Sequence, residues 1–203
     1  MVGAVILAPG YKPFDPTGFD FYGYRQIPDV VTSLEYERLL SASGPCMGHL
    51  VRPSDHRAPE KIAWIQCVGS RNTNRCDNSY CSSVCCMYAI KDAMIAKEHS
   101  HGNLDCAVFN MDIRSFGKDF DRYYSRTEQL PGVRFIRSYT SVVGENPENN
   151  NVVVRYAYDP LPVTAAEAQL LPGQGTLVEV QMAPDREGDV RSLRLELPDG
   201  LRA

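Results

Sequence analysis

The stretch from Cys67 to Cys86 constrains this chain more than any other, because it holds five of the seven cysteines among 203 residues. It reads Cys67-Val-Gly-Ser-Arg-Asn-Thr-Asn-Arg-Cys76-Asp-Asn-Ser-Tyr-Cys81-Ser-Ser-Val-Cys85-Cys86. A loop rich in Gly, Ser and Asn leads into a CxxxCC pattern, and a helical pattern follows. Thiolates at this density either bind a soft metal or exchange electrons through disulfides.

The rest of the sequence indicates the compartment. The apolar run at the N-terminus begins at Val2 without a basic flank, so no signal peptide is expected. No run of about eighteen apolar residues is present, so no membrane span is expected. We therefore expect a reducing, cytoplasmic compartment, where clustered cysteines more often bind metal or act in catalysis than form structural disulfides. The net charge of −4 argues against a general nucleic-acid binder.

The hydrophobic pattern predicts an α/β protein with a Rossmann-like parallel sheet. Strand, helix, strand, helix, strand is the alternation of a doubly wound unit. In the helix that follows the cysteines, Ala89 and Ala93 supply the packed face, while Lys91 and Asp92 face water. The predicted segments are strand 61–67, a helix from Ser82 or Ser83 to about His99, strand 105–111, helix 116–129 and strand 133–139, after a short helix at 33–41 with Thr32 or Ser33 as N-cap.

The two ends of the chain differ from this central unit. Val2 to Gly10 is a continuous apolar run that predicts a buried strand, either in a sheet of this chain or in one that belongs to another chain. Residues 11–27 are rich in aromatic rings that we expect to pack onto the core. After Gly144 the pattern predicts antiparallel hairpins, the first between Val142–Val143 and 152–158, the second between 176–182 and 190–197, with a linker at 159–175. We divide the chain into 1–60, 61–144 and 145–203.

The spacing of the cysteines favours one shared site. Cys81 and Cys85 are four residues apart and so lie on one face of a helical turn, and Cys86 is the next residue along the helix. Cys67 follows a strand whose carboxyl end is the usual place for a site in an open α/β sheet. An iron–sulfur cluster with four thiolates is an anion, which a helix N-terminus stabilises, and Gly69 and Ser70 would let backbone N–H groups approach it. Structural zinc, a redox dithiol and cysteines without any cofactor remain alternatives.

Six segments of the sequence give the chain a family resemblance. It resembles the A-subunit family of heterodisulfide reductases, in collinear order over roughly residues 1–158. The segments that carry the resemblance are Ile65-Gln-Cys-Val-Gly-Ser-Arg71, Tyr80-Cys-Ser-Ser-Val-Cys-Cys-Met-Tyr-Ala-Ile-Lys91, Met111-Asp-Ile-Arg-Ser-Phe-Gly-Lys118, the N-terminal run ending Ala8-Pro-Gly10, and Ser41-Ala-Ser-Gly-Pro45 with Arg52-Pro-Ser-Asp55.

The resemblance implies a thioredoxin-reductase-like flavoprotein core that passes electrons through FAD and iron–sulfur clusters. It implies a [4Fe–4S] cluster in the domain of nucleotide-binding type, and leaves the thiols of Cys46, Cys76 and Cys106 outside the ligand set. The N-terminal run with Ala8 and Gly10 resembles a late strand of the FAD domain, and the loop with Gly69, Ser70 and Arg71 takes the place of a dinucleotide phosphate loop. The implied cluster ligands are Cys67, Cys81, Cys85 and Cys86.

From these features we expect an iron–sulfur electron-transfer domain, a subunit or fragment of a flavin-containing oxidoreductase. It would relay electrons between a flavin and clusters of partner subunits in a heterodisulfide-reductase-like or quinone-linked complex. FAD would bind in the full protein or in a site completed by another chain. The alternatives are a docking module with structural zinc or free thiols, and a dithiol/disulfide reductase.

Overall fold

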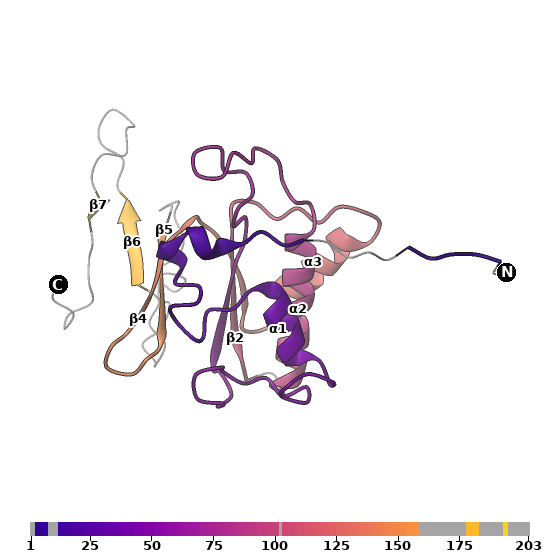
Figure 1. The fold of residues 1–203 in the computed structure, drawn as a ribbon, viewed down its shortest axis with the longest axis horizontal. Helices are drawn as coiled ribbons and strands as arrows, with labels where there is room; N and C mark the ends of the chain where they lie inside the picture. The colour runs from indigo at the N-terminus through magenta and orange to yellow at the C-terminus, as the bar shows by residue number, and fades with distance from the viewer. Residues whose placement is uncertain (1–2, 8–11, 102, 159–177, 183–192, 195–203) are drawn as a thin grey trace.

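The computed structural model describes residues 3–7, 12–101, 103–158, 178–182 and 193–194. Two sheets and a layer of helices make up the fold (Figure 1). The helices lie on one side of the parallel sheet, and the second sheet lies on the other side. None of the helices in the described part of the chain is long and apolar enough to cross a membrane.

The parallel sheet has the order β1-β2-β3. Its strands are β1 (Lys61–Ile65), β2 (Asp105–Asn110) and β3 (Val133–Arg137). Lys61 is paired with Asp105, and Cys106 with Val133. Five of the six β2 residues are buried, as expected for a central strand covered on both faces. The predicted parallel α/β unit is confirmed.

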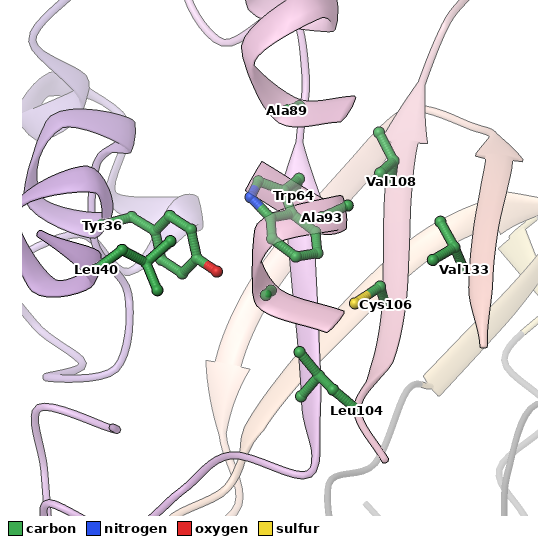
Figure 2. Close-up of a cluster of buried hydrophobic side chains, with 10 residues drawn as sticks. Tyr36, Leu40, Trp64, Ala89, Ala93, Leu104, Cys106, Val108 and Val133 are labelled. Atoms are coloured by element: carbon green, nitrogen blue, oxygen red, sulfur yellow. The ribbon is translucent and has the colours of Figure 1, made fainter. Parts of the chain in front are cut away.

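Three helices cover one face of this sheet: α1 (Ser33–Leu40), α2 (Cys85–His99) and α3 (Phe120–Glu128). The apolar side chains of α1 and α2 meet those of the strands in one core cluster, while the Tyr124 ring of α3 meets the Phe135 ring of β3 at a centroid distance of 4.8 Å. Figure 2 shows the alanines of α2 beside Trp64 of β1, with Tyr36 of α1 approaching from the other side. The rings of Tyr36 and Trp64 meet edge to face, with centroids 5.7 Å apart. The small alanine side chains let α2 lie close to the sheet.

The other face of the parallel sheet is covered by β4 (Thr140–Glu145) and β5 (Val152–Tyr158), which form the predicted antiparallel hairpin. The Phe109 ring of β2 contacts the Tyr156 ring of β5 at a centroid distance of 4.8 Å. The second predicted antiparallel pair is also confirmed, as β6 (Val178–Met182) and β7 (Leu193–Arg194). These strands join the hairpin in one sheet of order β4-β5-β6-β7, because β6 pairs in parallel with β5.

The aromatic segment after the N-terminus packs as expected. Two short 3-10 helices, Pro16–Gly18 and Asp20–Tyr22, bring the Phe19 and Tyr22 rings together with Ile27 and Val143 in a separate buried cluster. This cluster fastens the segment to β4.

Residues 3–7 are not a buried strand in a sheet of this chain, and the alternative, a strand in a sheet of another chain, stays a prediction. They form no strand, and Val5, Ile6 and Leu7 are 74%, 92% and 85% exposed. The apolar composition suits a strand, but within the described part of the chain no neighbouring strand pairs with it. The predicted linker at 159–175 and the turn between the last two strands lie outside the described residues.

Two further expectations about helices need correction. The helices α2 and α3 begin later than predicted, at Cys85 and Phe120, because Ser83 and Asp119 take left-handed φ angles of +65° and +69°. Asp92, which was expected to face water, is fully buried. It is covered because α1 packs over that face of α2, where Glu37 forms an ion pair with Lys91.

Candidate metal centre

Cys67 lies in a tight turn at the carboxyl end of β1. The Gln66 N–H still donates to the Phe109 carbonyl at 2.9 Å, so the strand pairing extends to this residue. Cys67 then takes a left-handed φ of +62°, and the Ser70 N–H donates to the Cys67 carbonyl at 3.1 Å. The Cys67 side chain is buried. The turn therefore holds this thiol at the edge where sites form in open α/β sheets.

Gly69 is required at this turn for two reasons. Its φ of +71° favours glycine, and a Cβ placed there would lie 2.2 Å from Cγ of the Phe14 ring. Phe14 belongs to the aromatic N-terminal segment and stacks on Phe19, with ring centroids 5.5 Å apart. The close approach of the ring to the backbone fixes the turn against that segment.

The loop between Cys67 and α2 folds back onto the turn. The Asn72 and Asn78 backbones exchange hydrogen bonds of 2.6 and 3.0 Å, forming a short antiparallel bridge. The Ser70 hydroxyl donates to the Tyr80 carbonyl at 2.9 Å and accepts from the Ser82 N–H at 3.1 Å. These bonds place Cys81, which follows Tyr80, beside the turn that carries Cys67.

Cys85 and Cys86 are the first two residues of α2. No side-chain hydrogen bond caps this end of the helix, and Val84 stands at the N-cap position. The unpaired N–H groups of a first helical turn carry partial positive charge, which stabilises a nearby anion. A hydrogen bond from the Cys86 thiol lowers the pKa of Cys85, while the same bond and burial raise the pKa of Cys86. The hydrogen bond between the two thiols therefore shifts their pKa values in opposite directions.

The thiols of Cys67, Cys81 and Cys85 are close enough to influence one another. Burial raises the pKa of Cys67, and the charges of Cys85 and Cys81 raise it further. The Cys67 backbone N–H donates to the Cys85 sulfur and lowers the pKa of Cys85. The end of β1 and the start of α2 therefore bring Cys67, Cys81 and Cys85 into one region.

The chain that follows β2 closes the other side of this region. The Met111 N–H donates to the Cys67 sulfur and the Arg114 N–H to the Cys86 sulfur, and each bond lowers the pKa of the thiol it reaches. The Cys86 sulfur lies 3.9 Å from the Asp112 carbonyl oxygen. The thiols thus lie between two neighbouring strand ends of the parallel sheet.

Ion pairs tie this segment to the cysteine loop. Asp112 forms ion pairs with both Arg71 and Arg114, the latter at 3.2 Å. The same two arginines hold the pKa of Asp112 below its ordinary value, against the opposing effect of burial. Arg114 also donates a hydrogen bond to the Cys81 sulfur. The positive charge of the two guanidinium groups therefore lies beside the thiols.

The donor set fits the chemistry of a thiolate-bound metal centre. All seven cysteines are free, and N–H donors reach the sulfurs of Cys67, Cys85 and Cys86. In the described residues, however, no three or more His, Cys, Asp or Glu side chains form an arrangement that could hold a metal ion. The assignment of ligands therefore stays a prediction.

The other predicted cofactor-binding positions fall in two places. Gly69, Ser70 and Arg71 form the turn and loop beside the thiols, whereas Ala8 and Gly10 lie outside the described residues. The backbone N–H groups of Ser70 and Arg71 are used within the loop, since they donate to the Cys67 and Tyr80 carbonyls. They are therefore engaged in holding the loop.

The three cysteines that the resemblance leaves out are held by other contacts. The Cys76 thiol donates to the Asn72 carbonyl at 3.3 Å, and Cys106 is buried within the main core. Cys46 lies in the loop after α1 and is partly exposed.

Sequence reasoning missed the N–H donors to sulfur at Ser83, Met111 and Arg114. The Ser83 N–H lies 3.3 Å from the Cys81 sulfur. A usable signal was present for Met111 and Arg114, because the carboxyl ends of neighbouring parallel strands meet at one edge. Ser83 gave no such signal, since its left-handed φ is a property of the folded loop.

No family model matches the chain. It is 44% identical over 204 residues to the iron–sulfur A-subunit 2 of CoB–CoM heterodisulfide reductase of Methanopyrus kandleri, covering 98% of this chain and 30% of the relative. It is 40% identical over 201 residues to the corresponding A-subunit of Methanocaldococcus jannaschii, with the same coverage. Identity to the A-subunit of the H(2)/formate:CoB-CoM heterodisulfide,ferredoxin reductase of Methanococcus maripaludis is 46% over 154 residues, covering 76% of this chain and 23% of that protein.

Proposed function

We propose that this chain, which belongs to the A-subunit family of heterodisulfide reductases, is an iron–sulfur electron-transfer domain. It is a partial domain of that family and spans about 30% of the length of two relatives. Its residues 61–144 would form the cluster-binding α/β unit. The relatives are named as A-subunits of heterodisulfide reductases. For this chain we propose the same general setting, as a redox part of a larger oxidoreductase.

The proposal is supported by the position of Cys85 and Cys86 at the uncapped start of α2, and by the electrostatic influence of Cys81 and Cys85 on the pKa of Cys67. Cys67, Cys81, Cys85 and Cys86 would hold a [4Fe–4S] cluster, which when bound accepts and donates single electrons. The partial positive charge of the first turn of α2 would stabilise the anionic group. Structural zinc is a poorer match to a lone Cys followed by CxxxCC than to two separated pairs.

The surrounding residues would set the properties of the centre. The N–H donors that reach sulfur from Met111 and Arg114 would stabilise thiolate charge, as such bonds do in iron–sulfur proteins. The buried side chains of Cys67 and Cys86 would exclude water on the core side, while Cys81 is partly exposed. The exposed side offers the shorter route for an electron to or from a partner.

Flavin and partner chains belong to the same proposal. FAD would bind in the longer protein or in a site completed by another chain, with Ala8 and Gly10 in the part that contributes to it. Other subunits of a heterodisulfide-reductase-like or quinone-linked complex would be the electron donor and acceptor. The support is the similarity to A-subunits of named complexes, five of whose names include H(2) or ferredoxin.

The test is metal analysis after anaerobic purification. We expect a brown protein with about four irons and four acid-labile sulfides per chain, and an EPR signal of a reduced cluster after treatment with dithionite. Cys85→Ser should lose most of the iron. Cys76→Ser is the matched control, since Cys76 lies in the same loop but outside the proposed ligand set, and it should keep the iron of the wild type.

Other outcomes would replace the proposal. Zinc at one equivalent in place of iron would indicate a structural site and a docking role. A preparation without metal, whose thiol titration rises on dithiol reduction, would indicate a disulfide reductase. Equal loss of iron in Cys85→Ser and Cys76→Ser would overturn the ligand assignment.

A further inference from the structure

Three charged side chains form a row of ion pairs beside the thiols. Arg71 belongs to the cysteine loop, while Asp112 and Arg114 belong to the segment that follows β2. The Asp112 carboxylate uses both of its oxygens, since Oδ1 pairs with Arg71 and Oδ2 pairs with Arg114 at 3.2 Å. The three side chains are between 24% and 42% exposed, so salt and water screen their charges only in part. A single carboxylate thus holds two guanidinium groups in place.

Contacts place this row of ion pairs against two of the predicted cluster ligands. The Asp112 carbonyl oxygen lies 3.9 Å from the Cys86 sulfur, and the Arg114 guanidinium donates to the Cys81 sulfur. Cys81 depends on such contacts for its position, because it lies in a loop, whereas Cys86 belongs to a helix. A second donor to the Cys81 sulfur is the Ser83 N–H, at 3.3 Å.

Arg71 shares the carboxylate with Arg114 but differs from it in one respect. Its charge lowers the pKa of Cys67 through space. In the described part of the chain, its side chain donates a hydrogen bond to Asp112 and none to a sulfur. The two arginines therefore carry the same charge on the same partner, and the difference between them is the contact of Arg114 with a thiol.

We propose that Arg114 positions Cys81 and raises the reduction potential of the centre, and that Asp112 holds Arg114 in this role. Reduction adds one electron to the centre and makes it more negative, while no bond forms or breaks. A reduced flavin of the same oxidoreductase would supply the electron. A fixed positive charge beside the sulfurs favours the more negative state, so it raises the reduction potential. This inference rests on the proposed function.

The reduction potential tests the proposal, measured by redox titration with EPR on the anaerobically purified full chain. Arg114→Gln should lower the equilibrium constant for reduction about tenfold, which is about 59 mV for a one-electron couple. Arg71→Gln removes the same charge and should lower it only about two- to threefold, because no contact with sulfur is lost. Arg134→Gln is the matched control and should leave it unchanged. Arg134 forms an ion pair of 2.8 Å with Asp105, which begins β2 and so lies at the opposite end of the sheet.

Two more variants separate position from charge. In Asp112→Ala, the loss of a negative charge alone would raise the potential, whereas release of both guanidinium groups into water lowers it. We expect the lower potential. Arg114→Lys keeps the charge without the planar fork that bonds to two partners at once, so its potential should lie between those of Arg114→Gln and the wild type. Iron content is measured in every variant.

The outcomes distinguish this inference from the proposed function. A wild type without an iron–sulfur cluster would overturn both. A potential that is unchanged in Arg114→Gln, or that falls no further than in Arg71→Gln, would overturn this inference alone. A higher potential in Asp112→Ala would overturn the positioning role of Asp112. If Arg114→Gln retains too little iron for titration, full iron in Arg114→Lys supports a charge beside Cys81, and equal loss in both overturns it.

Discussion

At the scale of single residues, the least expected side chain is Asp92. It is fully buried on α2, and neither carboxylate oxygen accepts a hydrogen bond from the described part of the chain, although the Lys91 Nζ lies 3.3 Å from Oδ1. Burial and the charge of Glu37 raise the pKa of Asp92 to about 7, against the opposing effect of Lys91. The periodic pattern predicted a solvent-facing position here, because it cannot register that α1 covers this face of α2.

We predict that Asp92 makes the protein less stable as the pH rises from 4 to 8. The pKa of the Asp92 carboxyl is near 3.8 in the unfolded protein and about 7 in the folded protein. The folded state therefore holds one more proton in this window, so the free energy of unfolding falls as the pH rises, by roughly 1–3 kcal/mol. Urea denaturation at pH 5 and pH 8 measures this, with the protein kept reduced.

Variants isolate the contribution of Asp92 from that of the cysteines. Asp92→Asn should remove this part of the pH dependence, because the amide does not ionise. Glu37→Gln should reduce it, since one neighbouring negative charge is lost. The assignment fails if wild type and Asp92→Asn lose stability equally between the two pH values.

At the scale of elements, the sequence was most informative where the signal is local. The capping box of α1 is an example: the Glu35 carboxylate accepts from the Thr32 N–H at 2.7 Å, and the Glu35 N–H donates to the Thr32 hydroxyl at 3.4 Å. Residue types at fixed spacing specify such a cap. Residues 3–7 show the limit of such local signals. Their composition suits a strand, but whether a strand forms depends on a neighbouring strand elsewhere. The start of α2 shows another, since the left-handed φ of Ser83 depends on the folded loop.

We predict that Thr32→Ala lowers the free energy of unfolding by about 1 kcal/mol, because two reciprocal hydrogen bonds at the start of α1 are lost. Chemical denaturation at fixed pH measures the change. Ser33→Ala is the matched control, one residue further along, where the described structure shows no side-chain hydrogen bond, and it should stay within about 0.5 kcal/mol of the wild type. Equal losses in the two variants would contradict the role of the cap.

At the scale of the whole molecule, the candidate site depends on contacts between distant parts of the chain. The main core joins Tyr36 and Leu40 to the parallel sheet, and a second cluster joins Phe109 to Val154 and Tyr156. These clusters cross the predicted limits at 60 and 144, and the division into three parts stays a prediction. The sequence predicted a shared site at the end of one strand and the start of the next helix, because both are local features, and the set of ligands stays a prediction. It could not predict that Phe14 packs on the cysteine turn, which depends on the path of the N-terminal segment.

This last contact leads to a prediction about stability. Gly69→Ala should lower the free energy of unfolding by roughly 2–4 kcal/mol, because the new Cβ meets the Phe14 ring and the φ of +71° disfavours alanine. Phe14→Ala in the same chain should recover the part caused by the steric clash and leave about 1 kcal/mol from the backbone. A double-mutant cycle by chemical denaturation, with iron content measured in each variant, separates the two causes. Additive losses would show that the ring and the turn do not interact, and the turn would then be held by its own loop alone.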